Sequence, residues 1–483
     1  MALSTVFFFS TLLVSFTHTM SCMTINTTSG IVEGNIESTT PNIAQYLGIP
    51  FAEPPVGARR WLAALPKSRE NQTIDATRFG LVCPQFENND GVRSNLYLTN
   101  VPEFSSPRNH QSEDCLTLNA RAPWIGEGDD GLGPELGRVP YFNPSSWVER
   151  SGRLIVVGIN YRLTIFGFPA AAGMPQGKQN LGLLDQRLGT EWVRDNIKNF
   201  GGDPARITLW GQSAGAISTD NYNFGYPEDP IVAGLIMDSG NSELTLASPD
   251  VEHINFTFFA RHFGCNGSDP TAEVECIRDI DAIVINQYRK KYSNSGNLLT
   301  ATIFPVVDNR TQLANYSVLA ASGNFSGVPA IIGATTNEGI AFLPYNRTYE
   351  PDQSVADMMN LQFFHCPAVK TTQDRYAGGA TTFLQLYDGN FSNITPLWWA
   401  GAYHSSELPM IFGTYDIARG EGTAFQNQVS EQMQDYWLAF AEDPVAAVLL
   451  GLGDEVARLI EQVVLEAPCN GAVPNGRPFP RFS

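Results

Sequence analysis

The chain has 483 residues, of which 43% are hydrophobic and only 16% are charged. This balance suits a large globular core and excludes the intrinsically disordered and fibrous classes. Thirty basic and 49 acidic residues give a net charge of −19, which repels phosphate backbones and anionic membrane surfaces, so we expect no nucleic-acid partner. The acidity fits the solubility of a secreted protein, and an acidic field that draws cationic substrates is the alternative interpretation.

The N-terminus predicts export. The first 16 residues, MALSTVFFFSTLLVSF, carry no charged side chain and contain a compact apolar stretch, as secretory signal peptides do. A membrane anchor would need about 18 apolar residues, and the Ser and Thr interruptions leave too few. We therefore expect a signal peptide over residues 1–21, a single domain over residues 22–483, no integral membrane segment and an extracellular location.

Sequons for N-glycosylation support this expectation, because ten of them in one chain indicate a glycosylated surface. They begin at Asn26, Asn71, Asn255, Asn266, Asn309, Asn315, Asn324, Asn346, Asn390 and Asn393.

Seven cysteines become disulfide candidates once the chain is taken to be exported. Cys265 and Cys276 flank a turn rich in small residues, and Cys83 and Cys115 bracket a polar stretch, whereas the remaining three have no obvious partner: Cys22, Cys366 and Cys469. None of the seven has the spacing of metal ligands, and the sequence indicates neither a metal nor a cofactor.

The recurring unit along the chain is a short apolar strand followed by a turn and a helix. Residues 153–160 (RLIVVGIN) are a β-branched run, and residues 184–198 repeat apolar side chains at helical spacing. Further strands are expected at residues 206–210, 234–237 and 330–334. This alternation predicts an α/β protein with a mostly parallel, doubly wound sheet whose functional groups lie at the carboxyl ends of the strands.

The sharpest local signal is the string GQSAG, which places Ser213 between two glycines directly after the strand RITLW. A strand, a tight turn and a small-residue helix start form a nucleophile elbow, which exposes the serine hydroxyl. The glycines allow a strained turn and close packing of strand and helix. The amide of Ala214 would then be one oxyanion donor. The alternative, a phosphate-binding loop, lacks the lysine and glycine spacing of such loops.

A serine nucleophile needs a general base, most often a histidine oriented by a carboxylate, and in this architecture both follow the serine in the order acid, then histidine. Of the six histidines, two precede Ser213 in the chain and are excluded as the base by this order. Two more flank the sequon at Asn255 and are expected on a glycosylated surface, and His365 lies beside a cysteine, which favours a structural role. His404 remains as the base. Glu338, in the turn of IIGATTNEG, fits the acid, although an ordinary exposed loop glutamate would give the same sequence pattern.

At this point several segments resemble the type-B carboxylesterase, lipase and cholinesterase family of α/β-hydrolases, particularly its secreted fungal members. They are GIPFAEPPVGARRW, SEDCLTLN, INYRLTIFGF, NLGLLDQRL, WVRDNIKNFGGDPARITLWGQSAG, GATTNEG and HSSELPMIFGTY, and the resemblance runs from about residue 24 to about residue 444. It implies an α/β-hydrolase fold with a helical excursion between about residues 220 and 316. It also makes Ser213 the nucleophile, Glu338 the acid and His404 the base, and it implies disulfides pairing Cys83 with Cys115 and Cys265 with Cys276.

One departure from the family lies between SEDCLTLN and RLIVVGIN. The family has another hydrophobic strand there, ending in an HGGGF-like turn whose glycine amides supply the other oxyanion donors. This chain instead carries residues 126–138, with five glycines, four acidic residues and no apolar run. A lost inner strand leaves its two neighbours with unpaired backbone groups. The spacing from Glu338 to His404 is also short for the family, and residues 449–483 depart from its usual ending.

The sequence thus predicts a secreted carboxylic ester hydrolase that works through an acyl-enzyme on a Ser-Glu-His triad and is impaired by the missing strand and turn. Its partner would be a small-molecule or lipid ester. The alternative is a catalytically inactive α/β-hydrolase-fold binding or adhesion protein, which usually lacks the nucleophile. The presence of all three triad residues favours the enzyme.

Overall fold

The structure is a computed structural model that describes residues 23–36, 39–85, 101–104, 111–122, 139–244, 247–248, 250, 252–267, 269–294, 303–344, 349–445 and 467–470. The expected signal peptide, Cys22, the sequon at Asn346 and the segment 126–138 lie outside these residues.

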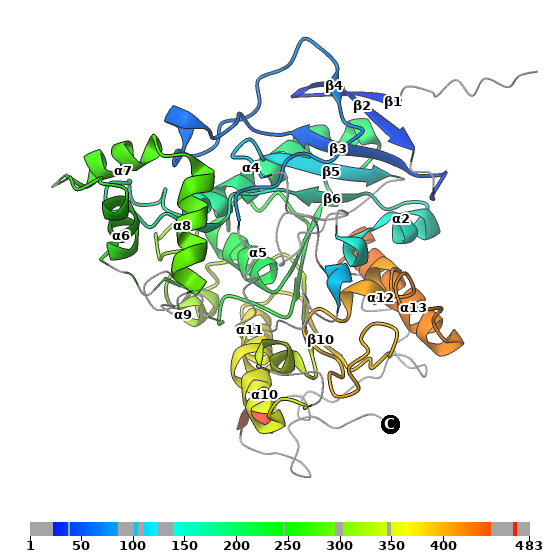
Figure 1. Ribbon diagram of the computed structural model, residues 1–483. Coiled ribbons are helices and arrows are strands. Elements are labelled where there is room, and N and C mark those ends of the chain that lie inside the picture. The colour runs from blue at the N-terminus through cyan, green and yellow to red at the C-terminus, as the bar shows by residue number, and fades with distance from the viewer. Residues whose placement is uncertain are drawn as a thin grey trace, which may run out of the picture.

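The N-terminal part of the chain forms a six-stranded sheet in the order β1-β2-β3-β5-β6, with β4 added beside β2. Its strands are β1 (Met23–Thr27), β2 (Gly30–Ile36), β3 (Ala44–Pro50), β4 (Ile74–Asp75), β5 (Thr117–Ala122) and β6 (Val156–Ile159). The pairs along this order are antiparallel, and only β4 runs parallel to its neighbour among the described residues. In Figure 1 this sheet lies at the top in blue and cyan.

A second, four-stranded sheet has the order β10-β9-β8-β7, and every pair in it is parallel. Its strands are β7 (Thr208–Gln212), β8 (Gly234–Asp238), β9 (Ala330–Thr335) and β10 (Thr382–Tyr387). All residues of β7, β8 and β9 are buried, which is the pattern of parallel strands covered on both faces. Three of the strands expected from the apolar runs therefore form this sheet.

The two sheets end at β6 and β7, and no ladder joins these strands among the described residues. The single, mostly parallel sheet expected from the sequence is therefore not what the structure contains. Both end strands are nevertheless buried along their length. Val156 and Trp210 enter one hydrophobic core, while Val157 and Leu209 enter another, so the same two cores flank both strands.

The helices surround the two sheets (Figure 1). They are α2 (Ser145–Ser151), α3 (Thr164–Gly167), α4 (Leu181–Asn196), α5 (Ala214–Gly225), α6 (Ile254–His262), α7 (Pro270–Arg278), α8 (Ala282–Asn294), α9 (Tyr316–Ala321), α10 (Gln353–Met359), α11 (Cys366–Ala377), α12 (Leu408–Phe412) and α13 (Ala424–Glu442). The expected helical excursion corresponds to α6, α7 and α8, which gather in green at the left of Figure 1. The helix expected at residues 184–198 is α4, which ends at Asn196 and continues as a 3-10 turn to Phe200.

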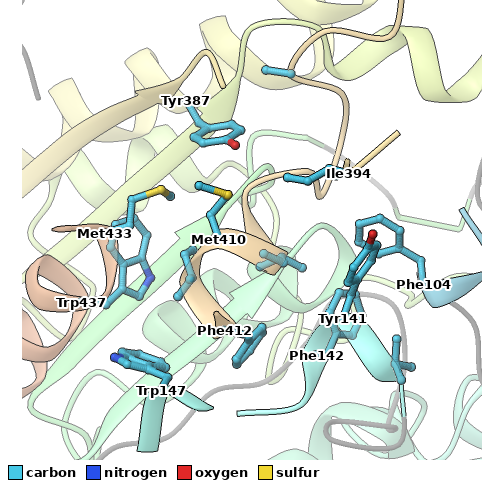
Figure 2. Close-up of a cluster of buried hydrophobic side chains, with 14 of the residues drawn as sticks. Phe104, Tyr141, Phe142, Trp147, Tyr387, Ile394, Met410, Phe412, Met433 and Trp437 are labelled. Atoms are coloured by element: carbon cyan, nitrogen blue, oxygen red, sulfur yellow. The ribbon is translucent and has the colours of Figure 1, made fainter. Parts of the chain in front are cut away.

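An aromatic core holds the C-terminal helices against the second sheet. The ring of Phe412 stacks on Trp210 of β7, with centroids 5.2 Å apart, and also packs near Trp147 of α2. Figure 2 shows Phe412 and Trp147 in this core together with Met410, Met433 and Trp437 from α12 and α13. This core fixes α12, and therefore the chain that immediately precedes it, against β7.

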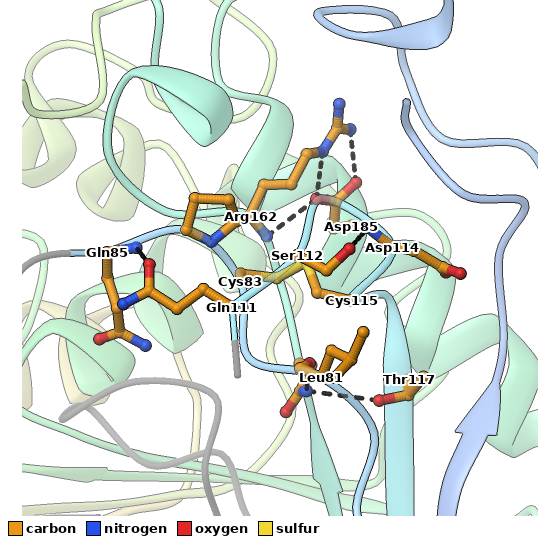
Figure 3. Close-up of a disulfide and its surroundings, with 12 residues drawn as sticks. Leu81, Cys83, Gln85, Gln111, Ser112, Asp114, Cys115, Thr117, Arg162 and Asp185 are labelled. Carbon is orange, nitrogen blue, oxygen red and sulfur yellow. Dashed lines mark hydrogen bonds and ion pairs between the residues drawn. A yellow bond between two sulfur atoms is a disulfide. The ribbon is translucent and has the colours of Figure 1, made fainter. Parts of the chain in front are cut away.

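Three disulfides join described residues. Cys83 pairs with Cys115, next to the buried ion pair of Arg162 and Asp185 (Figure 3), and Cys265 pairs with Cys276 between α6 and α7. These are the two pairings that the family resemblance implies. The third joins Cys366, the first residue of α11, to Cys469, two cysteines for which the sequence offers no obvious partner.

Candidate active site

Ser213 lies in the turn between β7 and α5, and it has the strained backbone of a nucleophile elbow. Its φ is 58° and its ψ is −118°, a region that costs a non-glycine residue free energy. The backbone N–H of Ser213 donates to the carbonyl oxygen of Asp238 at 2.8 Å and holds the turn against β8. A Cβ on Gly211 would lie 2.2 Å from the carbonyl carbon of Gly215, so strand and helix approach this closely only with a glycine at the end of the strand. The hydroxyl of Ser213 makes no hydrogen bond to another described residue.

Glu338 and His404 are 66 residues apart in sequence and form a buried pair. The Nδ1 of His404 lies 2.5 Å from Oε2 of Glu338, and Oε1 of Glu338 accepts the backbone N–H of Thr335 at 2.6 Å. The loops that carry the pair are tied together, because the N–H of Asn337 donates to the carbonyl of Ala402 at 2.9 Å. The carboxylate therefore fixes one nitrogen of the imidazole, which leaves Nε2 as the nitrogen able to accept a proton.

Two phenylalanines enclose the imidazole of His404. The ring centroid of Phe342 lies 4.9 Å from it and that of Phe364 lies 5.2 Å away. Phe364 belongs to a π-helical turn, Asn360–His365, between α10 and α11, and such turns are frequent at functional sites. Asn360 anchors this turn by accepting the backbone N–H of Gly339 at 2.5 Å. The imidazole of His404 is thus held by a carboxylate at one edge and by aromatic rings beside it.

Gln212, the residue before Ser213, also reaches His404. Nε2 of Gln212 lies 3.3 Å from Nε2 of His404, and both side chains are buried. This contact joins β7 to the loop of His404 and places the imidazole beside the residue that immediately precedes Ser213.

Two further carboxyl groups are buried near this pair. The pKa of Asp238 is raised from 3.8 to about 7, because burial, with a smaller effect of the charge of Glu338, outweighs the hydrogen bonds from Trp210 and Gln385 that lower it. Burial also raises the pKa of Glu407, at the N-cap of α12, well above its usual value, with Asp238 and Glu338 adding to the effect. These carboxyls are therefore biased toward their neutral forms.

Ala214 is the first residue of α5, and its backbone N–H makes no hydrogen bond to another described residue. An unpaired N–H at a helix start is the group that an oxyanion donor requires.

The sequence predicts this donor, but it does not predict the contact of Gln212 or the enclosure by Phe342 and Phe364. For Phe342, its position four residues after Glu338 was the signal available in the sequence. Metal-ligand clusters of three or more side chains are not found in the described part of the chain.

The expected sequon asparagines fall into two groups. Seven of them are exposed: Asn26, Asn71, Asn266, Asn309, Asn315, Asn324 and Asn390. Asn255 and Asn393 are buried, with 7% and 8% of their surface exposed. The side chain of Asn393 is also engaged, because its Oδ1 accepts Nε2 of Gln426 at 2.8 Å.

Comparison with known proteins identifies relatives along most of the chain. The profile of the carboxylesterase family matches residues 21–354 and 346–445. The chain is 40% identical over 445 residues to the chlorogenic acid esterase of Aspergillus niger, an alignment that covers 89% of this chain and 85% of that protein. It is 38% identical to secreted lipase 5 of Gibberella zeae, over 87% of this chain and 85% of that protein. It is 29% identical to the para-nitrobenzyl esterase of Bacillus subtilis, over 85% and 88% respectively. Within the described residues, no helix is long and apolar enough to cross a membrane.

Proposed function

Because the chain belongs to the carboxylesterase family and is a carboxylic ester hydrolase, we propose that it hydrolyses its substrate through an acyl-enzyme on Ser213. The observation that carries this proposal is the 2.5 Å contact of Glu338 with Nδ1 of His404, on loops beside a strained serine. The ester would be a small molecule or a lipid, since the relatives named above include both esterases and a lipase. We also propose that the protein is secreted.

The proposed reaction has two steps. Nε2 of His404 takes the proton of the Ser213 hydroxyl as the oxygen attacks the ester carbonyl, and the imidazolium then protonates the departing alcohol. In the second step His404 activates water, which releases the acid and restores Ser213. Glu338 keeps the hydrogen on Nδ1 and stabilises the charged imidazolium. Ser213 must turn its hydroxyl toward Nε2 for the first step, since this hydroxyl makes no hydrogen bond with the residues that the structure describes.

The oxyanion site is the weak part of the proposed machinery. Ala214 offers one amide, and the family's other donors come from a strand and glycine turn that this sequence lacks. The fold supports such a loss, because β6 and β7 lie against the same two cores and yet belong to separate sheets. We propose that the two sheets are the halves of one α/β-hydrolase sheet without its inner strand, within a single domain. Removing one oxyanion donor costs about 10²- to 10³-fold in turnover.

Labelling with a fluorophosphonate probe tests the nucleophile directly. We expect covalent labelling of the native chain and none of Ser213→Ala. A matched control is Ser218→Ala, because Ser218 lies on α5 and donates its hydroxyl to the carbonyl of Ala214, away from the base. Equal labelling of the native chain and Ser213→Ala would reject the assignment. Failure of every form to react, together with no hydrolysis of p-nitrophenyl esters, would favour a binding protein.

A further inference from the structure

The side chain of Gln212 is placed unusually for a buried amide. Only 1% of its surface is exposed, and its Oε1 accepts no hydrogen bond from the described residues. Its Nε2 has one neighbour to bond, Nε2 of His404 at 3.3 Å. An unpaired polar atom in a core costs free energy that an apolar side chain of the same shape would not, so the amide at this position calls for an explanation.

The contact of Glu338 at the other edge of the imidazole decides which group donates in the hydrogen bond between Gln212 and His404. A neutral imidazole carries one hydrogen, and the carboxylate of Glu338 lies 2.5 Å from Nδ1, where it accepts that hydrogen. Nε2 is left with its lone pair, and the amide N–H of Gln212 can donate to it. The two hydrogen bonds hold opposite edges of the imidazole from different strands of the sheet, because Glu338 follows β9 and Gln212 ends β7.

We propose that Gln212 is a positioning residue for His404, holding Nε2 at the elbow until the Ser213 hydroxyl takes its place. This inference rests on the proposed triad. Gln212 immediately precedes Ser213, so the amide holds the imidazole against the segment that carries the nucleophile. An amide also suits a ring that changes its charge: its N–H donates to the neutral imidazole, and its Oε1, turned toward the ring, accepts from the imidazolium. Methionine, of similar shape, does neither.

The test compares Gln212→Met with Gln385→Met as the matched control. Gln385 is also a glutamine near the carboxyl end of a strand, although it is only partly buried, and it donates to Asp238 at 3.2 Å and not to the imidazole. For each form, the binding constant of a fluorophosphonate probe and its bond-forming rate constant are measured separately. The loss of one hydrogen bond predicts about a fivefold lower rate constant for Gln212→Met, with unchanged probe binding, and no change for Gln385→Met.

A second readout does not depend on activity. In protein labelled with 15N-histidine, Gln212→Met is expected to move the Nε2 resonance of His404, while Gln385→Met leaves it in place. Reciprocally, His404→Ala should move the side-chain amide resonance of Gln212 but not that of Gln385. This measurement tests the proposal even if Gln212→Met folds poorly.

A rate within twofold of the native chain together with unmoved resonances would overturn the proposal. A rate constant that rises in Gln212→Met would overturn it too, since the amide would then obstruct the base. If no form reacts with the probe but the resonances respond, the acyl-enzyme proposal fails and the contact of Gln212 with His404 stands.

Discussion

Asp238 shows how a single buried carboxyl can make the stability of this fold depend on pH. Its side chain accepts the indole N–H of Trp210 at 2.6 Å, and its pKa is raised from 3.8 to about 7 by burial. The folded state therefore holds a proton that the unfolded chain releases near pH 4. The contribution of Asp238 to the free energy of unfolding is therefore fully present below pH 4. It falls as the pH rises toward 7, by up to roughly 4 kcal/mol.

Asp238→Asn should flatten this pH dependence, because the neutral amide has no charge to desolvate. Gln385 can turn its own amide to accept the new N–H, so the site stays paired. We expect urea unfolding at pH 8 to show a higher midpoint for the variant than for the native chain, and a smaller difference between them at pH 5. A residual slope should remain from Glu407, whose pKa is raised in the same direction. An identical slope in both proteins would contradict the assignment.

Glu338→Gln tests the acid of the proposed triad. The amide introduced by this change could offer an N–H to Nδ1 of His404 and so favour the tautomer with its hydrogen on Nε2, which cannot accept the Ser213 proton. We expect the bond-forming rate constant with a fluorophosphonate to fall by about 10⁴-fold while probe binding is kept. Glu407→Gln is the matched control, since its carboxyl is also buried but does not bond to the imidazole. A fall of less than tenfold in Glu338→Gln would argue against this role.

The proposed triad could be read from the sequence because its signals are local or ordinal. The glycines around Ser213 mark an elbow, and elimination among six histidines leaves His404. The contacts of Gln212, Phe342 and Phe364 with His404 could not be read in this way. They depend on how separate loops converge, across 192 residues of sequence for Gln212 and His404, and no spacing in the chain encodes that convergence.

At the scale of elements, the disulfide between Cys366 and Cys469 closes a loop of 103 residues at the start of α11, directly after the π-helical turn that carries Phe364. Changing both cysteines to serine should lower the free energy of unfolding by about 2–4 kcal/mol, since a long loop regains its entropy in the unfolded chain. Urea unfolding without reductant measures this loss. We also expect slower labelling of Ser213, because Phe364 packs beside the base.

The matched control for this prediction is the serine pair at Cys265 and Cys276, whose loop spans only 11 residues in the helical excursion. Its loss of stability should be smaller by roughly 2 kcal/mol, and labelling should be unaffected. Equal losses of stability in the two variants would contradict the loop argument.

Elements and their arrangement differed in how far the sequence predicted them. Apolar β-branched runs located β6, β7, β8 and β9 within a few residues, because burial on both faces leaves a continuous pattern. The same pattern says nothing about which strands become neighbours or whether they run parallel, since pairing joins residues far apart in the chain. The antiparallel ladder of the first sheet and the break beside β7 therefore required the structure.

At the scale of the whole molecule, the break between the sheets makes a prediction about repair. Inserting an apolar strand and a glycine turn after Ala122, where β5 ends, should join β6 to β7 and supply oxyanion amides. We expect turnover of p-nitrophenyl esters to rise by at least about 10²-fold. An insertion of equal length with a Gly/Ser composition is the control, and it should bring no gain. Comparable turnover from the native and repaired chains would show that the native chain already builds a complete oxyanion hole.

Burial divides the sequons, and this division predicts which carry glycans. Mass mapping of secreted protein should find glycans among the seven exposed asparagines and not at Asn255 or Asn393, because a glycan on a buried carboxamide would have to displace its neighbours. Glycans mapped to Asn393 would contradict the packing of its side chain against Gln426.

Ser213 follows β7, Glu338 follows β9 and His404 is tied to the Glu338 loop, so all three lie in loops at the four-stranded sheet. The break lies on the far side of β7 from β8. A deletion in the segment before β6 can therefore leave untouched the three residues that we propose as nucleophile, acid and base. If the proposed mechanism holds, one deletion would slow such an enzyme without removing its covalent chemistry, and one insertion would be a short mutational route back to a fast enzyme.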